Sequence, residues 1–125
     1  MTDTTGDLTG DTTGDAADLW ARVDALHTWL DRDRPDGGHQ EVLLRLLKLS
    51  EEVGEVAAAA VGATGQNPRK GTTHTWDDVQ AELCDVAITA LVALRALTPD
   101  PGAVFTAHLT RVTERSLNGP RPTAR

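Results

Sequence analysis

Two short segments of the sequence concentrate carboxylates at helical spacing. The segment at 48–56 reads KLSEEVGEV, and the segment at 81–86 reads AELCDV. At about 100° per residue, each segment would place its acidic side chains on one sector of a helix, beside the apolar residues rather than opposite them. These acidic side chains are Glu51, Glu52 and Glu55 in the first segment and Glu82 and Asp85 in the second.

A divalent cation would explain why so many like charges lie together. Like charges three or four residues apart destabilise a helix by roughly 0.2–0.5 kcal/mol per pair, and two facing acidic helices repel further. Carboxylate oxygens favour a hard cation, Mg2+ with Mn2+ as the alternative, over zinc. For either segment alone, a solvated acidic face is the competing interpretation. Lys48, one turn before Glu52, could pair within its helix or bind a phosphate.

A di-iron site of the ferritin-like kind is excluded by the histidines. Such a site needs a histidine three residues after a glutamate on two helices. None of the four histidines follows a glutamate at this spacing.

Four helices are expected to position these residues. Apolar periodicity and turn-forming residues predict helices over about 15–33, 40–61, 76–97 and 101–117. Thr75 and Asp100 are the expected N-caps of the last two helices. No segment alternates like a β-strand, so we expect an all-α four-helix bundle. The wide apolar coverage of the second helix favours a homo-oligomer.

The helices are expected to form one domain at 15–117, between two tails. Residues 1–14 repeat a Thr-Gly-Asp unit and contain one apolar side chain besides Met1, which predicts a disordered acidic tail. Residues 118–125 are expected to be flexible. The connection at 62–75 is longer than usual, which predicts a functional or mobile loop.

Composition restricts the partners of this 125-residue chain. A formal net charge of −7 argues against nucleic acid or an anionic membrane as the main partner. One cysteine, Cys84, excludes an intrachain disulfide and a multi-thiolate zinc site, and we expect it in the core. The first thirty residues contain no apolar region typical of a signal peptide, and no segment is long enough to span a bilayer. We therefore expect a cytoplasmic protein.

The order of the acidic residues resembles the MazG-like all-α nucleoside triphosphate pyrophosphohydrolase family. The pattern is Glu-Glu-x-x-Glu, then 26 residues, then Glu-x-x-Asp, and the resemblance covers about 38–117. Lys48-Leu49 and Gly54 also look like the family. The resemblance implies Mg2+-dependent cleavage of a (d)NTP to a (d)NMP and pyrophosphate, as in house-cleaning of the nucleotide pool. It also implies a homodimer or homotetramer with active sites near subunit contacts.

The resemblance also implies roles for individual residues. Glu51 would position or deprotonate the attacking water, with Lys48 beside it. The metal ligands would be Glu52, Glu55, Glu82 and Asp85.

Substrate contacts are less closely matched to the family. Basic side chains at Lys48, Arg69, Lys70, Arg111 and Arg115 are candidates for phosphate binding. Trp29 is the first candidate for stacking on the base, and His39 is the second. The last helix departs from the family, because the position of the expected Asn is apolar or Thr. Phosphoribosyl-ATP pyrophosphohydrolase and a non-catalytic helical module that binds a nucleotide or a partner are the alternative functions.

Overall fold

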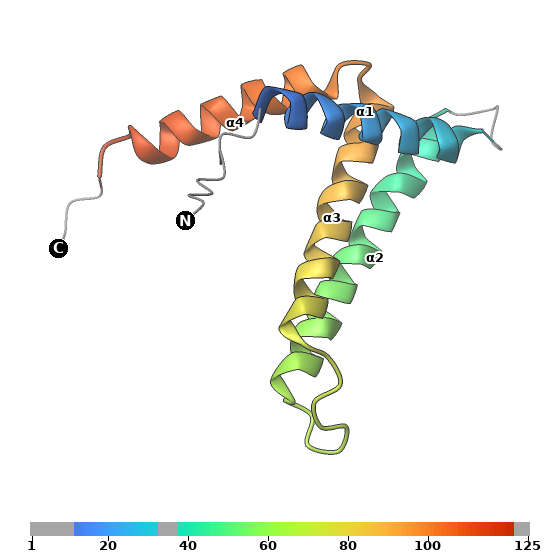
Figure 1. Cartoon of the computed structure of the whole chain (residues 1–125), viewed down its shortest axis with the longest axis vertical. Coiled ribbons are helices and arrows are strands. Elements are labelled where there is room, and N and C mark those ends of the chain that lie inside the picture. Colours follow the sequence, from blue (N-terminus) through green and yellow to red (C-terminus); the bar gives the residue numbers. More distant parts are fainter. Residues whose placement is uncertain (1–11, 33–37, 122–125) are drawn as a thin grey trace, which may run out of the picture.

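The computed structural model describes residues 12–32 and 38–121, which form four helices (Figure 1). No strand occurs within these two ranges, so the all-α prediction is confirmed. The helices are α1 (Thr12–Asp31), α2 (His39–Thr64), α3 (Trp76–Leu97) and α4 (Pro101–Leu117).

The predicted boundaries of α3 and α4 agree with the structure, and those of the first two helices differ by a few residues. α1 begins at Thr12, so the last residues of the predicted tail at 1–14 are helical. Residues 1–11 and 122–125 of the two predicted tails lie outside the described residues. α2 continues to Thr64 and ends at Gly65, whose φ of 62° is left-handed and suits a glycine.

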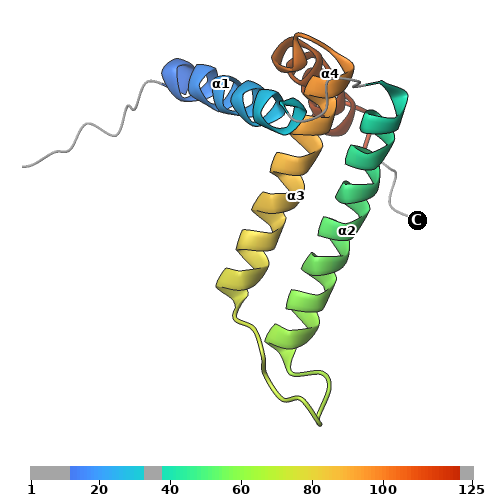
Figure 2. The same cartoon turned by 90° about the vertical axis from the view of Figure 1, so that its right-hand side faces the viewer.

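α2 and α3 form a long antiparallel hairpin, and α1 and α4 cross it at one end (Figures 1 and 2). α1 packs on α3, and α3 contacts the start of α4. Trp20 of α1 meets Phe105 of α4, with ring centroids 5.9 Å apart. Within one chain this arrangement differs from the predicted side-by-side bundle.

The link between α3 and α4 explains the change of direction. Pro99 disfavours helical geometry at the preceding residue, and Thr98 is extended, with φ −144° and ψ 141°. Asp100 then caps α4 as predicted, because its Oδ1 accepts a hydrogen bond from the Ala103 N–H at 3.3 Å. The chain therefore leaves α3 at an angle instead of folding back along it.

Few side chains of the described residues are buried. The buried apolar residues are Val23, Ala59, Val92 and Ala93. Cys84 is exposed, so its predicted place in the core is wrong. That prediction assumed a bundle that covers α3 on all sides, whereas α1 and α4 reach only one end of the hairpin.

A capping box fixes the start of α3, as the sequence predicts. The Thr75 hydroxyl accepts a hydrogen bond from the Asp78 N–H at 3.2 Å, and Asp78 Oδ2 accepts one from the Thr75 N–H at 2.8 Å. Each bond supplies an acceptor for a backbone N–H at the start of the helix, where no carbonyl of the helix is available.

Replacing Asp78 with Ala should destabilise the protein in a pH-dependent way. The hydrogen bond donated by the Thr75 N–H holds the pKa of Asp78 below its ordinary value of 3.8. The resulting stabilisation is present above the unfolded-state pKa and is lost as the pH falls through the folded-state pKa. We expect urea unfolding to show a lower free energy of unfolding for Asp78→Ala at neutral pH. The difference from the wild-type protein should shrink as the pH falls below 3.8 and through the folded-state pKa of Asp78.

Asp77→Ala is the matched control, because Asp77 lies in the same first turn without the capping hydrogen bonds. Equal effects of the two substitutions at neutral pH would contradict the prediction.

Candidate functional site

Three carboxylates meet where α2 and α3 run side by side. Carboxylate oxygens of Glu52, Glu82 and Asp85 lie within 4.8 Å of one another. Glu82 and Asp85 project from the same face of α3 because they are three residues apart. Glu52 is only 9 % exposed, so water screens its charge poorly. We call these three residues the acidic cluster.

The acidic cluster fits a hard divalent cation. Oε2 of Glu82 is buried, and no donor among the described residues bonds to it. Leaving a buried charged oxygen without a partner costs free energy, and so does the repulsion among the three carboxylates. A cation bound between them would remove both costs. The donor set contains only oxygen atoms, the ligand type that hard cations prefer.

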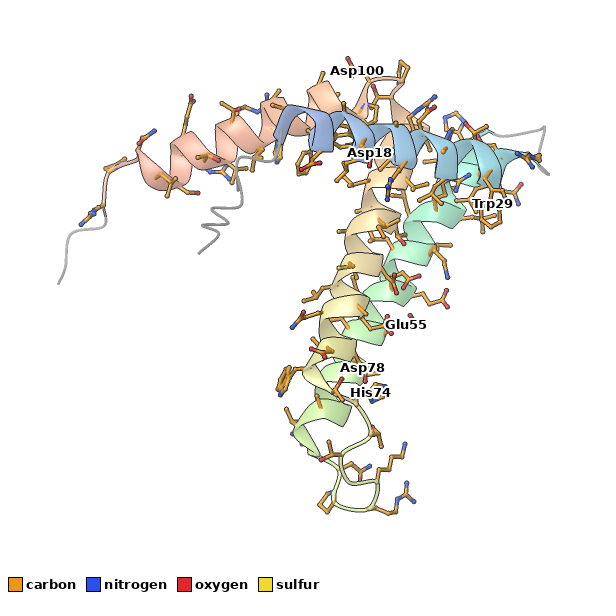
Figure 3. All side chains as sticks on the ribbon, in the orientation of Figure 1. Asp18, Trp29, Glu55, His74, Asp78 and Asp100 are labelled. Carbon is orange, nitrogen blue, oxygen red and sulfur yellow. The ribbon has the colours of Figure 1, made fainter. Side chains whose placement is uncertain are left out.

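Glu55, the fourth predicted metal ligand, is not part of the acidic cluster. It lies almost one turn beyond Glu52 on α2, and its side chain is exposed (Figure 3). The structure thus brings together three of the four predicted ligands.

Lys48 pairs with two glutamates of its own helix. Its Nζ lies 3.4 Å from Glu52 Oε1 and 3.6 Å from Glu51 Oε2. Glu51 is the main cause of the raised pKa of Lys48, followed by Glu52. The intrahelical pair is therefore present. Glu51, the predicted catalytic carboxylate, is exposed beside the acidic cluster.

A cleft of about 500 Å³ begins one helical turn from the acidic cluster on both helices. On α2, Lys48 lies four residues before Glu52, and on α3, Thr89 lies four residues after Asp85. Aliphatic side chains make most of the remaining wall, as is typical of small-molecule sites. The other residues that line the cleft are Leu26, Leu30, Glu41, Leu44, Arg45, Ile88 and Val92.

Arg45 was not identified as a candidate from the sequence. It is only 8 % exposed, and its Nη2 lies 2.6 Å from Asp31 Oδ1 and 3.0 Å from Glu41 Oε1. Asp31 also contacts His27 Nε2 at 3.2 Å. These contacts join α1 to α2 at the wall of the cleft. A cation among the leucines of LLRLL is the sequence signal that could have identified it.

The loop between α2 and α3 does not bring its cations to the acidic cluster. Arg69 and Lys70 lie beyond Thr64, the last residue of α2, which is about 18 Å from Glu52 along the helix axis. Backbone bonds close the loop on itself and on α2, including the bond from the Thr73 N–H to the Gly62 carbonyl at 3.0 Å.

The other predicted substrate contacts also lie elsewhere. Arg111 and Arg115 are exposed on α4, which extends away from the hairpin (Figure 1). Trp29 is 61 % exposed and does not line the cleft, although it lies on the same helix as Leu26 and Leu30 (Figure 3). His39 lines a different cavity, with a volume of about 380 Å³.

Comparisons with protein-family models, curated proteins and solved structures found no match. Among the helices described, none combines the length and apolar character that crossing a membrane requires.

Metal binding at the acidic cluster can be tested by thermal denaturation. We expect Mg2+ to raise the Tm of the wild-type protein, because the ion binds only the folded cluster. Glu82→Gln should abolish this increase and raise the Tm without metal, because it removes one of three repelling charges. Circular dichroism melts with Mg2+ and with EDTA would measure both effects.

Glu114→Gln, on the exposed surface of α4, is the matched control and should respond to Mg2+ as the wild-type protein does. An equal increase in wild type and Glu82→Gln would refute the metal site. Glu55→Gln tests the fourth ligand: the structure predicts a retained increase, and the sequence resemblance predicts a lost one.

Proposed function

We propose that this protein is a Mg2+-dependent nucleoside triphosphate pyrophosphohydrolase. It cleaves a (d)NTP to a (d)NMP and pyrophosphate and removes noncanonical or excess nucleotides. The observation that carries the proposal is the position of the acidic cluster at the end of an apolar cleft. Lys48 lies between the acidic cluster and the cleft. The MazG-like order of acidic residues supports the same conclusion.

Each residue of the site has a role in this reaction. Glu52, Glu82 and Asp85 would hold the metal, which when bound offsets the charge of the phosphates and makes the α-phosphorus a better electrophile. Glu51 accepts a proton from the water that attacks the α-phosphorus, and pyrophosphate leaves. Lys48 Nζ lies within 4 Å of carboxylate oxygens of both Glu51 and Glu52. A phosphate bound at the metal would therefore lie close to the positive charge of Lys48.

The cleft would accommodate the nucleoside part of the substrate. Its aliphatic walls suit the faces of a base, and its end near Lys48 suits the phosphates. The net charge of −7 does not oppose a polyanionic substrate, since the metal and Lys48 supply positive charge where the phosphates would lie.

We also infer that the protein assembles as a homodimer or homotetramer. On the outside of α2, Leu43 is 58 % exposed and Leu47 is 66 % exposed. α4 exposes Phe105 and Leu109 one turn apart, and a single 17-residue helix is marginally stable in water without a partner. Contiguous apolar faces of this kind are typical of protein interfaces.

Pyrophosphate release from a panel of nucleoside triphosphates with Mg2+ tests the proposed reaction. We expect release from at least one member, and we expect Glu52→Gln to reduce the rate by roughly 100-fold or more, because it removes a metal ligand. Glu114→Gln should keep the wild-type rate. The panel includes canonical and modified bases and phosphoribosyl-ATP.

Two results would contradict the proposal. Release of orthophosphate alone would place cleavage at a different bond. No release from any member by folded, metal-bound protein would favour the non-catalytic module.

The assembly is tested by light scattering of the protein as it elutes from a size-exclusion column. We expect a mass of two or four times 13.3 kDa. Leu47→Asp should shift the mass toward that of one chain, because burying a carboxylate in an apolar contact is costly. Gln80→Asp adds the same charge at an exposed polar position of α3 and should leave the mass unchanged. A wild-type mass of 13.3 kDa at micromolar concentration would refute the assembly.

A further inference from the structure

The buried guanidinium of Arg45 has hydrogen-bonding capacity that its ion pairs do not use. Both ion pairs are made through Nη2. Nε is buried, and no acceptor among the described residues bonds to it. A buried ion pair is not needed merely to link α1 to α2, because replacing such a pair by apolar residues is often neutral for stability. The unpaired donor therefore suggests a ligand.

Arg45 lies in the wall of the cleft, where the other polar groups do not offer a free charged acceptor. The carboxylate of Glu41 is engaged with Arg45 at 3.0 Å. Lys48, nearer the acidic cluster, is a donor only. Nε is shielded from solvent, but Arg45 is one of the residues that line the cleft, so a group that enters the cleft can supply an acceptor once the guanidinium turns toward it.

The spacing along α2 matches the length of a nucleotide. Arg45 precedes Glu52 by seven residues, which corresponds to about 10 Å along the helix axis. This length is comparable to the span from the α-phosphate to the far edge of a base. A nucleotide with its phosphates at the acidic cluster would bring the edge of its base to Arg45.

We propose that the cleft binds the base and that Arg45 selects bases with a carbonyl oxygen at C6 of a purine or C4 of a pyrimidine. Guanine, hypoxanthine, uracil and thymine carry this oxygen, and adenine and cytosine carry an amino group there. A carbonyl oxygen accepts the hydrogen bond that Arg45 offers, as arginine does with guanine O6 elsewhere. An amino group would place donor against donor. The inference rests on the proposed function for the class of substrate and extends it to the base.

Binding of nucleoside monophosphates to the full chain in the presence of Mg2+ tests the inference separately from turnover, because a monophosphate has no pyrophosphate group to release. IMP and AMP differ at this position of the base, and so do UMP and CMP. By isothermal titration calorimetry we expect IMP to bind more tightly than AMP by a factor of roughly 5 to 150, and UMP more tightly than CMP. Equal affinities within each pair, or no binding of any of the four, would overturn the inference.

Three variants assign the preference to Arg45. Arg45→Met should reduce the IMP-to-AMP affinity ratio to about one, because methionine donates no hydrogen bond. Asp31→Asn/Arg45→Met also removes the carboxylate charge that the single substitution leaves unpaired, and it replaces Arg45→Met if that variant does not fold. Asp31→Asn weakens the ion pair but leaves the guanidinium, so the ratio should be retained. An unchanged ratio in Arg45→Met or in Asp31→Asn/Arg45→Met would overturn the inference.

The binding experiment and the pyrophosphate assay can fail independently, so failure of base selection can be told apart from failure of the proposed reaction. A preference for IMP that depends on Arg45, in a protein that releases no pyrophosphate, would support base selection and refute catalysis. Pyrophosphate release without any such preference would support catalysis and overturn base selection.

Discussion

The packing of α2 against α3 is the interaction on which the described structure depends, because it holds three carboxylates close together against their repulsion. Glu52, Glu82 and Asp85 project into the contact between α2 and α3, where an apolar pair of helices would be more stable without them. The buried apolar residues nearest to the acidic cluster, Ala59 on α2 and Val92 on α3, each lie seven residues from one of its carboxylates. The hairpin thus maintains a local arrangement that is unfavourable for stability, as binding sites commonly do.

The local part of the site could be predicted from the sequence, because it depends on spacing within single helices. Glu82 and Asp85 share a face of α3 however that helix packs, because they are three residues apart. Thr75 and Asp78 form their capping box within four consecutive residues. The partnership of Glu52 with the α3 carboxylates follows from an antiparallel hairpin of two long helices.

The rest of the site depends on how α1 and α4 cross the hairpin, which periodicity does not determine. The cleft exists because Leu26 and Leu30 of α1 lie across α2 and α3. The ion pair that joins Arg45 to α1 exists because Asp31 at the end of α1 reaches it. The direction of α4, and with it the distance of Arg111 from the acidic cluster, follows from the extended residue before Pro99.

The contiguity of α2 and α3 in the chain has a consequence for the order of folding. Most contacts of the hairpin join residues on either side of one connection, whereas the contact of Asp24 with Arg95 closes a loop of 71 residues. Contacts of low sequence separation form early, since they cost less loop-closure entropy. The acidic cluster on α2 and α3 would then be assembled while the cleft is still open on the side of α1, so the two parts of the site would form in separate steps of folding.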